Sequence, residues 1–219
     1  MNYLKKTDTH TNITEKKRKS SENNFYWEII PNVLSSIEVQ QLRHIALKAK
    51  DLVLKYNKTK KTIGSPKYWR GLDMASKDIN LHKYYRSYLN NTIHSKRYTK
   101  LASEYLNPLY LFNDQLVTKL PNENFSFDIH YDNQFDIGDD YNGITLMLIL
   151  DDFTDVNGTI QCYADEWVTL YPKEGDILVL NGTTKHRSSI NRSKDSRSTY
   201  ILHYTDGFIN PRFHSERLV

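Results

Sequence analysis

The character of the sequence changes at Pro108, and this change constrains the fold more than any other feature. After Pro108, β-branched and aromatic residues occur in about eight short runs that turn residues interrupt. Runs at 176–180 and 198–202 are clear strands, and three Asn-Gly dipeptides, at 142–143, 157–158 and 181–182, predict tight hairpin turns. Helices followed by antiparallel strands predict a mainly β fold with flanking helices and a double-stranded β-helix (jelly roll) core.

The segment before Pro108 has the pattern of one strand followed by helices. A strand-like run at 25–30 ends at Pro31. Ser35 and Glu38 have the spacing of a capping box, in which each side chain accepts a hydrogen bond from the other residue's backbone N–H. Apolar residues then recur at helical spacing. We expect three helices, at about 36–54, 79–89 and 95–106, and a long loop at 56–75.

Charge divides the chain into two parts. Residues 1–24 have no hydrophobic period and carry a net charge of +3, whereas the other 195 residues carry only +1. We expect a disordered basic tail over 1–24 and a single jelly-roll domain with N-terminal helices over 25–219. A nearly neutral body gives no firm indication of nucleic-acid binding. No feature of the sequence specifies an oligomeric state.

Cysteine content and apolar runs exclude several classes of protein. Cys162 is the only cysteine, which excludes an intramolecular disulfide and a thiolate metal cage. The longest apolar run, 144–150, contains Thr145 and is much shorter than the ~18–20 residues that span a bilayer. The N-terminus has no apolar stretch of signal-peptide length. We therefore expect a soluble, cytoplasmic protein without a membrane partner.

The tripeptide His130-Tyr131-Asp132 is the first candidate for a chemical site. It ends a strand-like run at 125–131, and residues i and i+2 of a strand point to the same side. The imidazole and the carboxylate can therefore converge on one point. With eight histidines in 219 residues, a His-x-acid pattern arises about once by chance. It occurs twice, and no histidine follows the second copy, at 214–216, to complete a site.

His186 gives the first tripeptide a companion. It follows the strand at 176–180 and an Asn-Gly turn, 54 residues after His130. Two histidines and one carboxylate on adjacent jelly-roll strands form a facial triad, which holds Fe(II) and leaves three coordination positions open. Taken alone, a histidine at this place is better explained as a polar residue beside a hairpin.

Arg197 lies eleven residues after His186, on the next predicted strand. It has the same parity as Thr199, Ile201 and His203, so these side chains share one face of that strand. A guanidinium inside a barrel requires an anionic partner, and a small dicarboxylate would supply one through two parallel hydrogen bonds. The alternative is a surface arginine in a charged stretch.

These motifs together resemble the phytanoyl-CoA dioxygenase family, whose members are Fe(II)- and 2-oxoglutarate-dependent oxygenases. The string at 186–193 followed by Arg197 resembles the family's distal-histidine segment, and His130-Tyr131-Asp132 resembles its His-x-Asp. Further similar segments occur in the family's order, at 30–35, 150–154, 157–158 and 174–176. The sequence departs from the family at 161–165, where Gln-Cys-Tyr-Ala-Asp replaces a frequent Pro-Gly-Ser-His. A prolyl-hydroxylase-like relative is the alternative within the superfamily.

The resemblance implies a function and a set of site residues. It implies an enzyme that uses Fe(II), 2-oxoglutarate and O2 to hydroxylate an unactivated C–H bond of a small-molecule substrate, releasing succinate and CO2. The implied metal ligands are His130, Asp132 and His186. The implied cosubstrate contacts are Arg197, with Ser188 as a helping hydroxyl, and the weaker candidates Lys119 and Asn113; for Lys119 the alternative is a surface lysine.

Two other functions stay open at this stage. One is a non-catalytic jelly-roll binding protein that retains a vestigial site. The other is a cupin-like metal protein that uses no 2-oxoglutarate. Arg197 separates this hypothesis from the oxygenase, because a protein that binds no 2-oxoglutarate does not need an inward-facing arginine. Tyr68, Trp69 and Arg70, in the expected loop, are candidates for a lid over the substrate.

Overall fold

The structure of the chain is a computed structural model, and it describes residues 25–60, 68–69, 87–89, 91–122, 124, 126–134, 141–207 and 216–217. The predicted tail at 1–24, most of the predicted helix at 79–89, and Arg70 lie outside the described residues. No helix of the described part is long and apolar enough to cross a membrane.

The N-terminal part follows the predicted order of strand and helix. Strand β1 (Trp27–Ile30) precedes helix α1 (Ser36–Lys60). The capping box is present: the Ser35 backbone N–H donates to Glu38 Oε2 at 2.9 Å, and the Glu38 backbone N–H donates to Ser35 Oγ at 3.3 Å. Helix α1 extends into the stretch for which we expected a loop, and α4 (Lys96–Ser103) lies within the third predicted helix.

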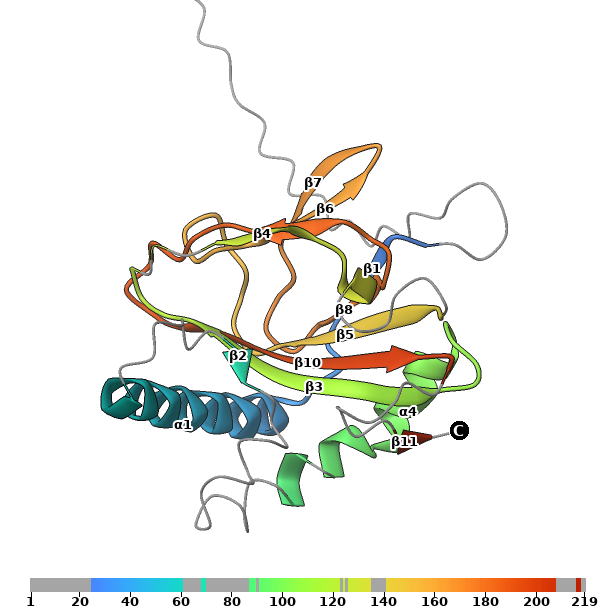
Figure 1. The fold of residues 1–219 in the computed structure, drawn as a ribbon, viewed down its shortest axis with the longest axis horizontal. Helices are drawn as coiled ribbons and strands as arrows, with labels where there is room; N and C mark the ends of the chain where they lie inside the picture. Colours follow the sequence, from blue (N-terminus) through green and yellow to red (C-terminus); the bar gives the residue numbers. More distant parts are fainter. Residues whose placement is uncertain are drawn as a thin grey trace, which may run out of the picture.

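The strands form two antiparallel sheets that face each other, which confirms the predicted jelly roll (Figure 1). The larger sheet has the order β1-β8-β5-β10-β3-β11, with β2 (Tyr68–Trp69) also paired to β3, and the smaller sheet has the order β4-β9-β6-β7. The remaining strands are β3 (Tyr110–Lys119), β4 (Phe127–His130), β5 (Gly143–Ile149), β6 (Ile160–Ala164), β7 (Glu166–Leu170), β8 (Ile177–Asn181), β9 (His186–Ser188), β10 (Arg197–Thr205) and β11 (Glu216–Arg217).

The predicted Asn-Gly hairpins are wrong. In the described part, consecutive strands from β3 to β10 cross between the sheets, and the exception is the β6–β7 hairpin, which turns through Asp165 at a φ of 72°. Gly158 does use a left-handed conformation, at a φ of 86°. Gly182 has a different role, because a Cβ at this position would overlap Asn133 Oδ1. Its small size lets the segment after β4 approach the end of β8.

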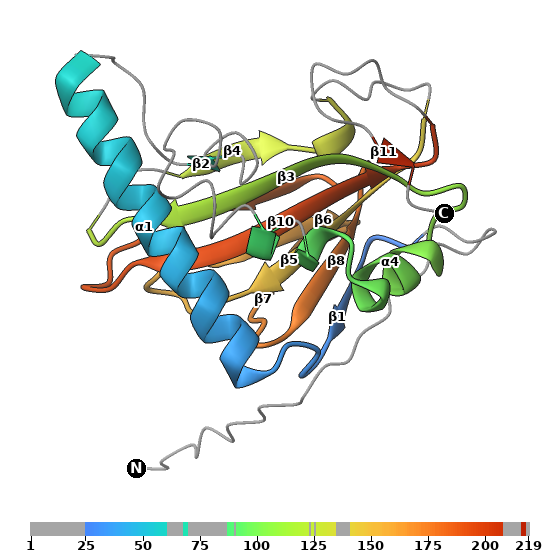
Figure 2. The same ribbon diagram turned by 90° about the horizontal axis from the view of Figure 1, so that it is seen from below.

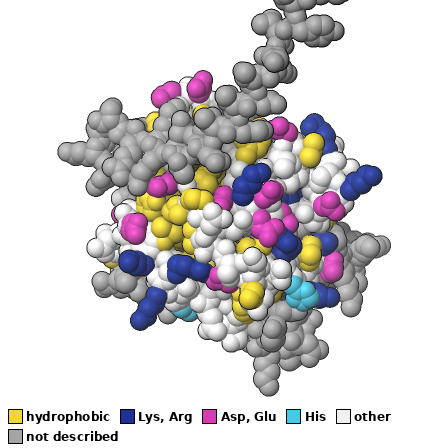
Figure 3. Space-filling model, turned by 180° about the vertical axis from the view of Figure 1, so that it is seen from behind, with side chains coloured by type: hydrophobic (Ala, Val, Ile, Leu, Met, Phe, Trp, Pro, Cys, Tyr) yellow, Lys and Arg dark blue, Asp and Glu magenta, His cyan; other side chains and the backbone are white. Residues whose placement is uncertain are grey.

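Helix α1 crosses the outer face of the larger sheet (Figure 2), and the sheet is therefore covered on both sides. Leu42 and Ile45 of α1 belong to one buried cluster with Leu146 and Leu202 of the sheet. A second cluster fills the space between the two sheets, and it includes Trp27, Met147, Phe153, Cys162 and Ile201. On the face drawn in Figure 3, basic and acidic side chains are interspersed around a hydrophobic patch.

Candidate metal centre

His130 and His186 face each other inside the jelly roll. They are register partners on the paired strands β4 and β9, and their ring centroids lie 4.2 Å apart. Directly opposite residues of an antiparallel pair project from the same face of the sheet. Cys162 of β6 is in turn the register partner of His186 and is buried. Both imidazoles therefore project from the smaller sheet into the interior.

A β-bulge orients His130. The register of β4 and β9 pairs Phe127 with Ser188 and His130 with His186, so β4 holds one extra residue between the two pairs. Such a bulge redirects the side chain that follows it. It also brings the carbonyl oxygen of Asp128 to 2.7 Å from His130 Nδ1.

The two imidazoles each form a backbone hydrogen bond through Nδ1. A carbonyl oxygen only accepts, so His130 Nδ1 donates to Asp128 O, and His186 Nδ1 donates to Thr184 O at 3.0 Å. In the neutral imidazole, Nε2 then carries the lone pair. Burial, and next the neighbouring His186, lower the pKa of His130, which favours this neutral form.

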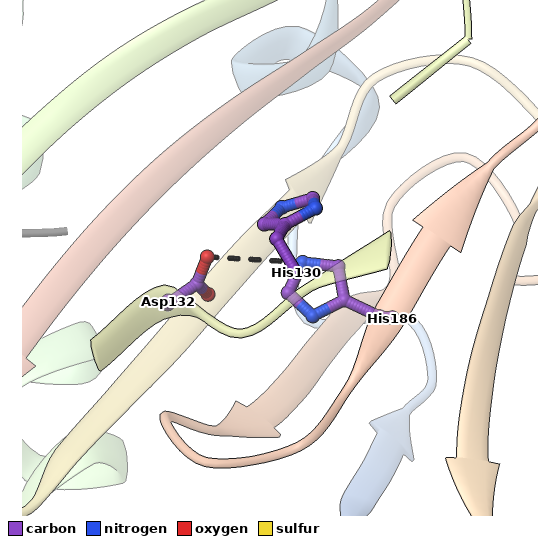
Figure 4. Close-up of side chains that lie close together, drawn as sticks. All are labelled: His130, Asp132 and His186. Carbon is purple, nitrogen blue, oxygen red and sulfur yellow. Dashed lines mark ion pairs between the residues drawn. The ribbon is translucent and has the colours of Figure 1, made fainter. Parts of the chain in front are cut away.

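Asp132 completes the cluster from a short helical turn and not, as we expected, from the strand itself. It is the first residue of the 3-10 helix η1 (Asp132–Gln134), which follows β4. The Asn133 backbone N–H fixes this turn by donating to Gly182 O at 2.9 Å. Figure 4 shows Asp132 beside the two imidazoles, with its Oδ1 at 3.7 Å from His186 Nε2.

The three side chains are close enough to share one ion. One ligand atom from each of His130, Asp132 and His186 lies within 4.8 Å of the other two. Burial opposes ionisation of Asp132, but His186, His203 and the Thr145 hydroxyl together hold its pKa below the usual value. An anionic oxygen and two neutral imidazole nitrogens are a ligand set for a divalent transition metal.

Arg197 projects into the same interior from the larger sheet. It is 3% exposed, its Nη1 donates to Thr199 Oγ1 at 3.1 Å, and its guanidinium lies 4.0 Å above the Phe153 ring. Its Nε is buried without a hydrogen-bond partner in the described part of the chain. Burial lowers the pKa of Arg197 to about 10, partly opposed by Asp151, so the side chain stays cationic at neutral pH. A buried cation with an unused donor is suited to hold an anion.

Lys119 is buried, so the surface-lysine alternative is wrong. It is 1% exposed, it is the register partner of Arg197, and its Nζ donates to Ser189 O. Ser188 is buried on β9, two residues from His186 and therefore on the same face. Asn113 lies on β3 opposite His203, but its side chain is outside the described part.

Three polar residues of the site were not among the predicted ones: Thr199, Thr145 and His203. Thr199 carries a hydroxyl and lies two residues after Arg197 on the same strand face, so the sequence could have indicated it. Thr145 is the only polar residue in the apolar run at 144–150. Nothing in the sequence indicates that Thr145 and His203 become register partners, because that pairing is a long-range property of the sheet.

The fold and the cluster together define a jelly-roll protein with a two-histidine, one-carboxylate site. No protein-family model and no curated protein matches the chain, so membership of the phytanoyl-CoA dioxygenase family stays a prediction. Solved structures do share the fold. AviO1 from Streptomyces viridochromogenes Tue57 is similar with a TM-score of 0.63 and 20% identity, over 85% of this chain and 92% of that one.

Two enzymes of nogalamycin biosynthesis are also similar. The epimerase SnoN, described as non-heme and α-ketoglutarate dependent, has a TM-score of 0.60 and 19% identity, over 82% of this chain and 77% of its own. The carbocyclase SnoK, described in the same terms, has a TM-score of 0.60 and 18% identity, over 82% and 79%. At such identities the likeness shows the fold.

Proposed function

We propose that the chain is an Fe(II)- and 2-oxoglutarate-dependent oxygenase. The observation that carries the proposal is the pairing of two features in one interior: the cluster of His130, Asp132 and His186, and the buried guanidinium of Arg197 with its unused Nε donor. A metal protein of the cupin kind explains the first feature and not the second. SnoN, which has this fold, was crystallised with Fe3+ and α-ketoglutarate.

The donor set is suited to Fe(II). Two imidazole nitrogens and one carboxylate oxygen hold one face of an octahedral ion, and three positions stay open. Asp128 O and Thr184 O accept the Nδ1 hydrogens and so orient both rings, and in the neutral imidazoles the lone pair is then on Nε2. Asp132 supplies the anionic ligand itself, and the site therefore needs no external anion to complete it.

The cationic end of the interior is suited to the cosubstrate. Arg197 offers a planar fork of donors to a carboxylate, and Lys119 adds a second positive charge on the neighbouring strand. Thr199 from the larger sheet and Ser188 from the smaller sheet supply hydroxyls to the same interior. Phe153 and Phe127, which lie against Arg197 and Lys119, exclude water from these charges. Bound Fe(II), 2-oxoglutarate and O2 would supply the oxidation, releasing succinate and CO2.

The proposed substrate is a small molecule, and the proposed outcome is hydroxylation of an unactivated C–H bond. The protein's contribution is to place that bond beside the metal and to keep water out. SnoN and SnoK are described as an epimerase and a carbocyclase, so this fold also serves other oxidations.

Titration of 2-oxoglutarate into the Fe(II) form without oxygen tests the proposal. Arg197→Lys keeps the charge and loses one charge-assisted hydrogen bond, so we expect affinity for 2-oxoglutarate to fall about 10- to 150-fold, equivalent to about 1.5–3 kcal/mol. Arg197→Ala should lose more, and Fe(II) affinity should stay unchanged in both variants.

Arg187 provides a matched control. It lies on β9 between the two inward residues His186 and Ser188, and it contacts Gln161 and the Trp167 ring on the other face. Arg187→Lys should leave both affinities unchanged. Equal affinity of the parent and of Arg197→Ala for 2-oxoglutarate would remove Arg197 from the site.

A further inference from the structure

Two polar side chains lie behind Asp132, and the proposed function does not use them. Thr145 on β5 donates its hydroxyl hydrogen to Asp132 Oδ2, and His203 on β10 has its Nδ1 at 2.9 Å from Thr145 Oγ1. Thr145 is 2% exposed and His203 is 9% exposed. Apolar residues surround them on both strands, so their presence is not explained by packing alone.

The number of available hydrogens fixes the direction of the two hydrogen bonds that link His203, Thr145 and Asp132. An ionised carboxylate only accepts hydrogen bonds, so the single hydroxyl hydrogen of Thr145 goes to Asp132. Thr145 Oγ1 must then be the acceptor toward His203, and His203 Nδ1 carries a hydrogen. The order of donation is therefore His203 to Thr145 to Asp132.

The three groups are held by paired backbone segments. Thr145 and His203 are register partners on the two central strands β5 and β10. Asp132 is fixed independently, since its neighbour Asn133 is bonded to Gly182. One carboxylate oxygen, Oδ2, is thus engaged from behind, and the other, Oδ1, faces His186 Nε2.

We infer that Thr145 and His203 are positioning residues that make Asp132 a ligand through one oxygen only. The inference rests on the proposed metal site and deepens it. If both oxygens of Asp132 bound the metal, the protein would occupy four of the six coordination positions in place of three. By engaging Oδ2, the pair preserves three open positions for the cosubstrate and O2.

Four variants test the inference: Thr145→Val, which removes the hydroxyl at constant shape; Thr145→Ser, which keeps it; His203→Leu; and the double variant Thr145→Val/His203→Leu. Each is titrated with Fe(II) without oxygen. Loss of an outer hydrogen bond to a metal ligand typically lowers metal affinity about 10- to 100-fold, and we expect this for Thr145→Val. Thr145→Ser should bind like the parent.

The double variant separates positioning from general damage to the interior. His203 Nδ1 lies 2.9 Å from Thr145 Oγ1 and 3.9 Å from Asp132 Oδ2, so the two substitutions remove parts of one network, and the double variant should lose less Fe(II) affinity than the two single losses added together. The visible absorption spectrum of the Co(II) form reports the number of ligand atoms, and it should change in Thr145→Val and not in Thr145→Ser.

The outcomes are distinct. Parent-like Fe(II) affinity and an unchanged Co(II) spectrum in Thr145→Val would overturn the inference and leave the metal site intact. Losses that simply add in the double variant would also overturn it. A parent protein that binds no Fe(II) would overturn the proposed function and this inference with it.

Discussion

Strand β10 presents two buried faces that differ in what they contain. Tyr200, Leu202 and Tyr204 point toward the helices and join an apolar cluster with Leu42 of α1. The intervening residues line the space between the sheets, and they include Arg197, Thr199 and His203. Both faces are excluded from water to a similar degree, so burial alone does not separate a core from a site.

The polar groups make the difference. On the helix-facing side, Tyr200 Oη donates to Asp114 Oδ2 at 2.8 Å. Tyr204 Oη has no partner in the described part, but it is neutral, and a lost neutral hydrogen bond costs less than a lost charged one. On the inner side the unused donor belongs to a guanidinium. A buried group that is both charged and incompletely paired therefore indicates a functional site more strongly than a neutral one does.

The largest expected effect is on the inner face. His130→Ala or His186→Ala removes one of the three proposed ligands, so stoichiometric Fe(II) binding should be lost, while the metal-free protein should unfold near the parent temperature. Anaerobic titration and thermal unfolding measure the two quantities. Undiminished iron binding in both variants would show that the ligands lie elsewhere.

The opposite effect is expected on the helix-facing side. Leu146→Ala deletes a fully buried side chain of β5, and such a change typically costs about 2–5 kcal/mol of unfolding free energy. Its Fe(II) affinity at a temperature where it is folded should equal that of the parent. Denaturant unfolding measures the loss of unfolding free energy. A parallel loss of iron affinity would mean that the two faces are not independent.

A matched pair of glycines sharpens the comparison. Gly182→Ala would place a methyl group against Asn133, displace the turn that carries Asp132, and lower Fe(II) affinity by about 10-fold or more. Gly175→Ala strains a residue at a φ of 89° in the turn before β8. It should reduce stability without changing iron affinity. Equal iron affinities of the two variants would contradict the role of Gly182.

The smallest effect is expected when Arg197 becomes an apolar residue. Arg197→Met removes a buried charge whose pairing is incomplete, and such replacements are often neutral or stabilising. The melting temperature of the metal-free protein should therefore stay at or slightly above that of the parent. A decrease as large as that of Leu146→Ala would instead make Arg197 a structural residue held by Thr199 and Phe153.

Local signals in the sequence predicted much of the fold. The Ser35–Glu38 capping box forms and begins α1, and the strands around 176–180 and 198–202 are present as β8 and β10. The Asn-Gly hairpins failed because that signal describes a two-residue connection within one sheet. A jelly roll sends successive strands to opposite sheets, and a local motif does not encode this choice.

Candidate site residues were predicted where short motifs and strand parity indicated them, and were missed where only pairing between strands brings them together. The triad and Arg197 followed from short motifs, and the parity of β10 placed Arg197 inside. For Lys119 the sequence favoured a surface residue, because its burial becomes visible only in its pairing with Arg197. The support of Asp132 by Thr145 and His203 depends on register between β5 and β10, which no local pattern specifies.

The central claim is that one interior holds both the metal and the cosubstrate. Its most direct test is the visible absorption of the anaerobic Fe(II) protein during addition of 2-oxoglutarate, with succinate, which lacks the keto oxygen, as control. We expect a weak charge-transfer band that saturates at one equivalent with 2-oxoglutarate and does not appear with succinate. Iron binding without any band would instead indicate a metal-binding jelly roll that does not use 2-oxoglutarate.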